Sequence, residues 1–224
     1  MNYQRFCLIL VTATAIHRIE TPNPLSYLSP PSRVHNVEFF STNAIAEAVE
    51  ELQRTNPELK TLDIINYAPI LVVLKEYFRN GFSGRSGLEL GIEPETMNLF
   101  RYLQKKGCQM HGVGYNAPGN EGFSSEEISD YLRKTEGSEL FDFIYARKVL
   151  TTISSLRNSL QRLLEIYKGI HSNLKDGGYL IALDEFSEII HGEMSLPTET
   201  IVNLGFEIID EFYLSLSFSH FASS

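Results

Sequence analysis

Cysteine is almost absent from this chain, which carries only Cys7 and Cys108. Two cysteines cannot build a disulfide framework or a thiolate zinc site. The six histidines are scattered, and no two of them stand at helical ligand spacing, so we expect no metal site. Basic residues are also few: 19 Lys and Arg face 28 Asp and Glu, which gives a formal net charge of −9 without a basic stripe. Nucleic acids and anionic membrane surfaces attract basic patches, so neither is predicted as a partner.

The N-terminal segment allows two interpretations. Arg5 precedes the apolar run 6–11, and Thr12-Ala13-Thr14-Ala15 follows it. A basic start, a short apolar stretch and an Ala-x-Ala step are the parts of a secretory signal peptide, here residues 1–15, and cleavage would make the protein secreted or periplasmic. The alternative is a buried first strand or helix of a cytoplasmic protein. In both cases the run is too short for a stable membrane span.

A proline-rich segment separates this start from the rest of the chain. Four prolines fall between Thr21 and Ser32, so residues 16–40 are predicted to form an extended spacer. Residues 41–224 then form one domain with its core in 86–224. Within it, a helix beginning near residue 41 and an apolar helix over 70–78 are predicted to cover the main sheet.

From Ser86 the chain alternates between strands and helices, which predicts an open, mostly parallel, doubly wound α/β sheet. Ser124 and Glu127 have the spacing of a capping box for the helix that follows them. Near the C-terminus, residues 206–209 and the alternating stretch 212–218 are predicted to pair as two antiparallel strands. The predicted strands are 87–91, 108–113, 141–145, 179–183, 206–209 and 212–218.

Three segments, in order, resemble a class I S-adenosylmethionine-dependent methyltransferase. Residues 88–96, LELGIEPET, resemble the first strand and glycine-rich cofactor loop of that family, residues 141–150 resemble its fourth strand, and residues 174–181, LKDGGYLI, resemble the turn into its fifth strand. The C-terminal strand pair fits the antiparallel pair that distinguishes this fold from nucleotide dehydrogenases. The resemblance implies a cofactor site at Glu89, Gly91, Glu93, Glu95, Gly114, Asn116 and Tyr145.

The departures from the family pattern lie within this site. Glu93 and Glu95 occupy two glycine positions of the loop, where two like charges about 4 Å apart would repel by roughly 4 kcal/mol at an effective dielectric of about 20. Gly114 stands where the family places the acid that holds the ribose hydroxyls, although Asn116 offers a hydrogen-bonding group nearby. Between Gly114 and Phe141 there is room for a loop and one helix, but hardly for the usual helix, strand and adenine-side loop.

Other polar residues follow the predicted strands at the same sheet edge. Arg147 is either an anion-binding group or a surface arginine near the acidic loops. An acidic group with one histidine follows the strand 179–183 and is interpreted as a solvated loop, with His191 as a general base in the alternative. The group comprises Asp184, Glu185, Glu188, His191 and Glu193.

Two functions remain open on this evidence. The first is a non-catalytic binding or interaction module on a methyltransferase-like scaffold, with no cofactor and with a small molecule or a protein as its partner. The second is an active methyltransferase of a small molecule that uses S-adenosylmethionine through a remodelled loop. Fold alone does not decide between them, because function depends on the site. No catalytic residue is assigned in either case.

Overall fold

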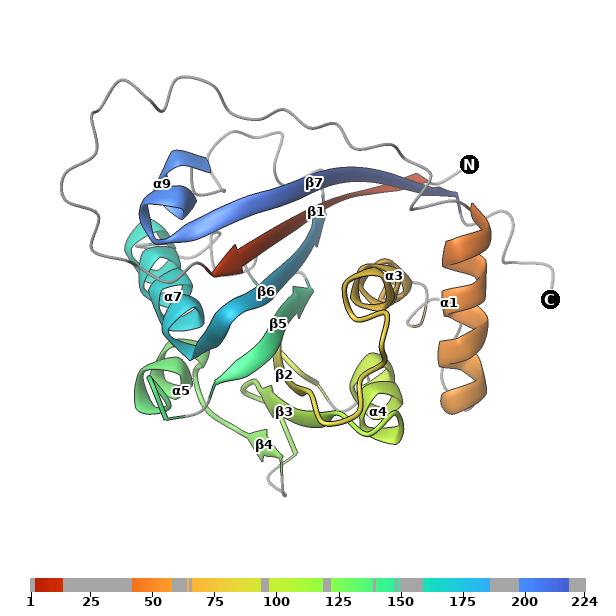
Figure 1. Ribbon diagram of the computed structural model, residues 1–224, viewed down its shortest axis with the longest axis horizontal. Coiled ribbons are helices and arrows are strands. Elements are labelled where there is room, and N and C mark those ends of the chain that lie inside the picture. Colours follow the sequence, from red (N-terminus) through yellow and green to blue (C-terminus); the bar gives the residue numbers. More distant parts are fainter. Residues whose placement is uncertain are drawn as a thin grey trace.

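The computed structural model describes residues 3–13, 42–57, 64, 66–93, 97–118, 122–138, 140–147, 149, 159–185 and 198–217. These residues form one sheet with the strand order β4-β3-β2-β5-β6-β1-β7 (Figure 1). The five strands from β4 to β6 are parallel, whereas β1 is antiparallel to both of its neighbours. The predicted, mostly parallel α/β sheet of Rossmann-like type is confirmed. The strands are β1 (Tyr3–Ala13), β2 (Ser86–Leu90), β3 (Gln109–Val113), β4 (Phe123–Ser124), β5 (Phe141–Arg147), β6 (Leu174–Glu185) and β7 (Phe206–Ser217).

Helices cover both faces of this sheet, as expected for a doubly wound fold. One face packs against α3 (Ala68–Tyr77) and α4 (Asn98–Lys105), and α1 (Thr42–Thr55) packs on the outer side of these two helices. The other face packs against α5 (Ile128–Lys134), α7 (Ser159–Asn173) and α9 (Thr198–Asn203). The predicted cover by helices before residue 86 is confirmed for α3, whereas α1 forms an outer layer that shares the same core cluster.

The sequence of β5 explains why both faces can be covered. Phe143 and Tyr145 point into the core under α3, while Ile144 and Ala146 point into the core under α7, and all four are at most 1% exposed. Side chains alternate between the faces of a strand, so an uninterrupted apolar run serves two cores at once. The apolar composition of β5 therefore explains why this strand lies in the middle of the sheet, where both of its faces are covered.

The predicted C-terminal strand pair is wrong. Phe206–Ser217 is a single strand, β7, and its antiparallel partner is β1 from the opposite end of the chain. A register shift separates the pairs Leu10–Asp210 and Val11–Ile208, which is a bulge in β7. Asp210-Glu211 breaks the apolar pattern without supplying the positive-φ residue that a tight hairpin turn needs. The break in the apolar pattern between residues 209 and 212, which was predicted to be a turn, is therefore a bulge within β7.

The N-terminal segment forms a strand within the sheet. β1 lies between β6 and β7, with Leu8 opposite both Leu183 and Phe212. This arrangement is the strand alternative of the two interpretations of this segment, and cleavage after Ala15 stays a prediction. The proline-rich segment 16–40 lies outside the described residues.

The stretch between β3 and β5 also differs from expectation. It contains β4, a two-residue strand parallel to β3, so a third parallel strand is present on this side of the sheet. A strand this short has no periodicity that a sequence pattern can reveal. The predicted capping box is wrong, because Ser124 ends β4 and Glu127 makes no side-chain cap for α5. Glu127 instead accepts hydrogen bonds from Ser129 and Arg162.

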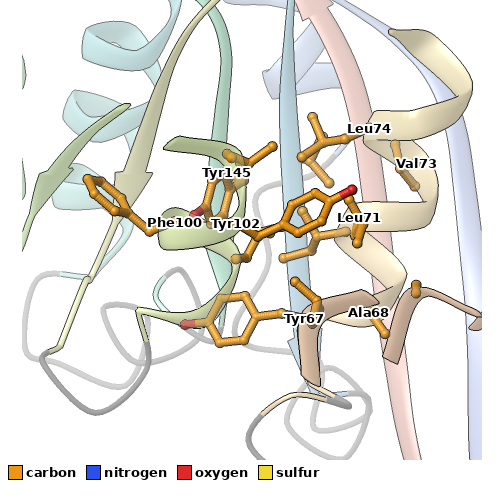
Figure 2. Packing of buried hydrophobic residues seen from close by; sticks show 14 of the residues in the cluster. Tyr67, Ala68, Leu71, Val73, Leu74, Phe100, Tyr102 and Tyr145 are labelled. Carbon is orange, nitrogen blue, oxygen red and sulfur yellow. The ribbon is translucent and has the colours of Figure 1, made fainter. Parts of the chain in front are cut away.

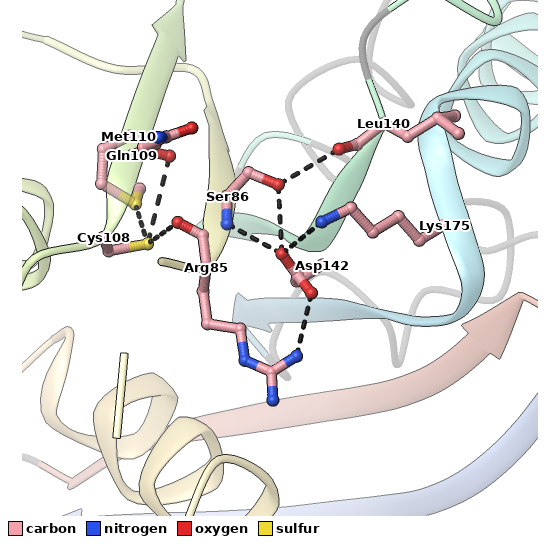
Figure 3. Close-up of polar contacts among 8 residues, drawn as sticks. All are labelled: Arg85, Ser86, Cys108, Gln109, Met110, Leu140, Asp142 and Lys175. Atoms are coloured by element: carbon pink, nitrogen blue, oxygen red, sulfur yellow. Dashed lines mark hydrogen bonds and ion pairs between the residues drawn. The ribbon is translucent and has the colours of Figure 1, made fainter. Parts of the chain in front are cut away.

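Asp142 holds three parallel strands together at their amino ends (Figure 3). Its Oδ2 accepts hydrogen bonds from the Ser86 amide at 2.8 Å and the Lys175 ammonium at 2.7 Å, and its Oδ1 accepts one from Arg85 at 3.0 Å. Burial alone would raise the pKa of Asp142, but its bonds to Lys175, Ser86 and Arg85 outweigh burial and lower the pKa to about 2. The acid of the Phe141-Asp142 pair therefore has a structural role.

We expect Asp142→Ala to lower the free energy of unfolding by about 2 kcal/mol, because a partly buried amide and two cations lose a charged acceptor. Denaturant unfolding near neutral pH measures the loss. Asp130→Ala is the matched control, since Asp130 forms an ion pair with Arg133 but is 52% exposed, and its loss should cost less than about 0.5 kcal/mol. The folded pKa of Asp142 lies below its unfolded value, so the difference between wild type and Asp142→Ala should shrink as the pH falls below about 4. Equal losses in the two variants would contradict this role.

Candidate functional site

The carboxyl ends of β2 and β5 define the candidate site. From β2 the chain proceeds to β3 and β4 on one side, and β5 and β6 lie on the other side, so the strand order reverses between β2 and β5. Open α/β sheets bind their ligands in the crevice at such a reversal. Glu89 and Tyr145 are neighbours in register at this point. The structure thus brings together two of the residues that the sequence predicted for the site.

Glu89 is enclosed by two tyrosines. The Tyr145 hydroxyl donates to Oε2 of Glu89 at 2.5 Å, and the Tyr67 hydroxyl donates to Oε1 at 3.1 Å. All three residues are at most 2% exposed. Figure 2 shows Tyr67 and Tyr145 in the core that α3 and α4 complete on this face of the sheet. Both carboxylate oxygens therefore already have partners from within the protein.

Burial raises the pKa of Glu89 to about 7, although the hydrogen bonds from Tyr145 and Tyr67 and the charge of Arg147 act in the opposite direction. Burial and the adjacent Glu89 raise the pKa of Tyr145 well above its ordinary value, so the phenol stays protonated and donates. A carboxyl group with a pKa near neutrality is able to exchange a proton under physiological conditions.

Arg147 completes this group of residues at the end of β5. Its guanidinium lies over the ring of Tyr67, with Cζ 5.0 Å from the ring centroid. The residue as a whole is partly exposed, but its Nε is enclosed and has no hydrogen-bond partner among the described residues. We call Glu89, Tyr67, Tyr145 and Arg147 the switch-point cluster.

The turn after β2 is closed by its own backbone. The amides of Gly91 and Ile92 both donate to the Val113 carbonyl, at 2.8 and 3.1 Å. Gly91 has φ +75°, and a Cβ built there would lie 2.3 Å from Cγ2 of Val149. Ile92 is fully buried. Two amides that a cofactor loop would offer to a ligand therefore donate to a carbonyl of the protein instead.

Gly114 lies directly beneath this turn. A Cβ at Gly114 would lie 2.6 Å from the carbonyl oxygen of Ile92, so an acidic side chain does not fit here unless the turn moves. Asn116 and Glu93 are exposed, and Glu95 lies outside the described residues. Of the seven residues predicted for the site, Glu89 and Tyr145 form a hydrogen-bonded pair, and Gly91 and Gly114 contribute backbone packing.

Tyr67 is the site residue that sequence reasoning missed. It precedes α3, outside the predicted core of 86–224, and no periodicity or motif marks it. Among the acids that follow β5 and β6, Asp184 and Glu185 belong to the end of β6, whereas Glu188, His191 and Glu193 lie outside the described residues.

Other kinds of site find no support within the described part of the chain. Cys108 is buried, and burial raises the pKa of its thiol to about 12, which makes it a poor nucleophile. No group of three or more His, Cys, Asp or Glu side chains suited to a metal ion occurs among the described residues. Their helices are all too short or too polar to cross a membrane.

Comparison with protein-family models finds no match for this chain, and comparison with curated proteins finds no significant one.

We expect wild-type stability to fall relative to Glu89→Gln as the pH rises from about 5 to about 8, by roughly 3 kcal/mol. The folded pKa of Glu89 is raised above its unfolded value, so between the two values the unfolded chain has lost a proton that the folded chain keeps. Stability is therefore fully present below the unfolded pKa and is lost as the pH rises to about 7. Denaturant unfolding of both proteins across this range measures the difference in their free energies of unfolding. The contributions of the other titrating groups cancel in this difference.

Glu51→Gln is the matched control for this experiment. Glu51 is also bonded to a tyrosine, Tyr102, but it is only partly buried, and the bonds from Tyr102 and Lys75 lower its pKa despite this burial. Its difference from wild type should stay constant above about pH 5. A constant difference for Glu89→Gln over the same range would refute the burial of a protonated carboxyl group.

Proposed function

We propose that this protein is a non-catalytic binding or interaction module with a scaffold of the class I methyltransferase type, and that it has lost ordinary S-adenosylmethionine binding. The proposal rests on the resemblance of residues 88–96, 141–150 and 174–181 to that family and on the geometry of the switch point. Its ligand is a small molecule or a protein.

The sheet supports the scaffold type. Five parallel strands are followed at the β6 edge by one antiparallel strand, β1, and then by β7. An antiparallel strand at this edge is what separates the methyltransferase type from nucleotide dehydrogenases. The strand comes here from the N-terminus instead of a C-terminal hairpin, which leaves its place in the sheet the same.

The closed turn after β2 is the observation that carries the loss of cofactor binding. Glycine-rich cofactor loops work because the backbone leaves room and free amides for the ligand. Here the amides of Gly91 and Ile92 bond to Val113, and the Ile92 side chain is buried against β3, where a Cβ on Gly112 would lie 2.9 Å from it. The space above the ends of β2 and β3 is therefore occupied by the chain itself.

The absent acid supports the same conclusion. Gly114 supplies no carboxylate for a ribose, and the Ile92 carbonyl lies too close for a longer side chain. Asn116, the substitute that the sequence offered, is exposed. A ribose at this position would find neither the space nor the charged acceptor that hold it in the family.

One observation favours the alternative, an active methyltransferase with a remodelled loop. Glu89 and Gly91 are the two loop residues that match the family, and Glu89 has the raised pKa that is common in functional sites. In that hypothesis Glu89 organises the loop and S-adenosylmethionine is the cofactor. However, the hydrogen bonds from Tyr67 and Tyr145 to its two oxygens favour a structural role for Glu89.

Calorimetric titration of the full chain with S-adenosylmethionine and S-adenosylhomocysteine tests the proposal. We expect no heat of binding up to about millimolar ligand, an affinity weaker than about −4 kcal/mol. Binding of either compound at micromolar concentration would overturn the proposed loss of cofactor binding and favour the enzyme alternative.

Substitution of Glu93 and Glu95 by glycine separates charge from packing. We expect the Glu93→Gly, Glu95→Gly variant to remain silent in the same titration, because Ile92 and the bonds to Val113 still close the turn. The matched control is Glu47→Gln, Glu50→Gln, which removes two exposed acids from α1 and the same net charge. Micromolar binding in the glycine variant alone would show that the two acids, and not the packing, prevent cofactor binding.

A further inference from the structure

Arg147 is costly for the fold as it stands. A buried polar group without a hydrogen-bond partner destabilises the folded state, and more so when it is charged. The Nε of Arg147 is such a group among the described residues, while the Tyr67 ring lies on one side of the guanidinium. Neither Glu89 oxygen accepts a hydrogen bond from it; the bonds to Glu89 come from Tyr67 and Tyr145.

Arg147 lies where a ligand could reach it. It is the last residue of β5, at the carboxyl edge where the strand order reverses, and it is partly exposed although Nε is enclosed. The exposed surface of the residue therefore belongs to its other atoms. With Nε enclosed, the N–H groups of the two Nη atoms form the planar fork that matches an oxyanion. This fork is pre-organised, so it loses little entropy for each hydrogen bond that it forms.

We propose that Arg147 binds the oxyanion of a small molecule, a carboxylate or a phosphate, at the carboxyl edge of β5. This inference rests on the proposed function, since it names the chemistry that the binding module recognises.

Glu89 couples this site to protons. Among the described residues, the groups that act on it are Tyr67 from the segment before α3 and Tyr145 and Arg147 from β5. An anion on Arg147 offsets the positive charge that favours ionised Glu89, so it favours protonated Glu89. By linkage, protonated Glu89 favours the anion to the same extent. An ionised Glu89 would instead compete with the ligand for the same guanidinium.

Titration of the full chain with sodium acetate, and separately with inorganic phosphate, tests this proposal. Thermal unfolding and calorimetry are compared with sodium chloride at equal ionic strength. We expect acetate to bind wild type at about pH 6 and to bind at least about fivefold more weakly at about pH 8.5. The acetate arm is decisive for the pH effect because its own charge is constant in this range, and the phosphate arm shows which oxyanion is preferred.

Two substitutions locate the site. Arg147→Met should abolish the anion effect without lowering Tm in chloride, because it removes the enclosed Nε, which has no hydrogen-bond partner among the described residues, while keeping an apolar chain on Tyr67. Arg147→Lys keeps the charge but loses the fork, and it should weaken binding at least about fivefold, which provides the answer if the Met variant does not fold. Arg79→Gln is the control: Arg79 is 74% exposed on α3's C-terminal side and its loss should change nothing.

Glu89→Gln tests the coupling. It should bind acetate with an affinity that no longer changes between about pH 6 and about pH 8.5. The proposal is overturned if acetate and phosphate stabilise no more than chloride, if both Arg147 variants bind like wild type, or if the pH effect survives in Glu89→Gln. Silence toward both anions and toward S-adenosylmethionine would remove this inference alone, whereas micromolar S-adenosylmethionine binding would remove the proposed function.

Discussion

The two hydrogen bonds from the amides of Gly91 and Ile92 to the Val113 carbonyl govern the carboxyl edge of the sheet. They fold the turn after β2 over the end of β3, which buries Ile92 and makes a side chain at Gly114 impossible without movement. Gly91 is needed for this path because its φ of +75° is strained for residues with a Cβ and because Val149 packs against it. A glycine that resembles part of a cofactor loop is thus explained by the protein's own packing.

The pKa values of the buried acids at the two edges of the sheet are shifted in opposite directions. At the amino edge, Asp142 has two cations and an amide, and its pKa is lowered to about 2. At the carboxyl edge, Glu89 accepts hydrogen bonds from two phenols, and one arginine acts on it through its charge without a hydrogen bond. Burial raises the pKa of Glu89 to about 7. Full ion pairing makes Asp142 a fixed connection between strands. Incomplete pairing leaves Glu89 able to take up or release a proton where open α/β sheets carry their ligands.

Much of the fold could be predicted because its signals are local. The strand predicted at 141–145 and the helix predicted to begin near residue 41 depend on residues a few positions apart, and they correspond to β5 and α1. The predicted C-terminal hairpin is wrong because strand pairing is not local: β7 pairs with a strand about two hundred residues away, and the bulge in β7 resembles a turn in the sequence. The two-residue β4 was too short to leave a pattern.

The sequence by itself determined the alternation of strands and helices, the parallel core and the acidic residues in the turn after β2, since each follows from residue type and spacing. Only the tertiary structure decided what that turn does. Tyr67 reaches Glu89 across 22 positions, and Val113 receives the turn's amides, because the two helical layers and the sheet order bring these groups together. Such contacts depend on which surfaces are buried against each other, and no single segment of the chain carries that information.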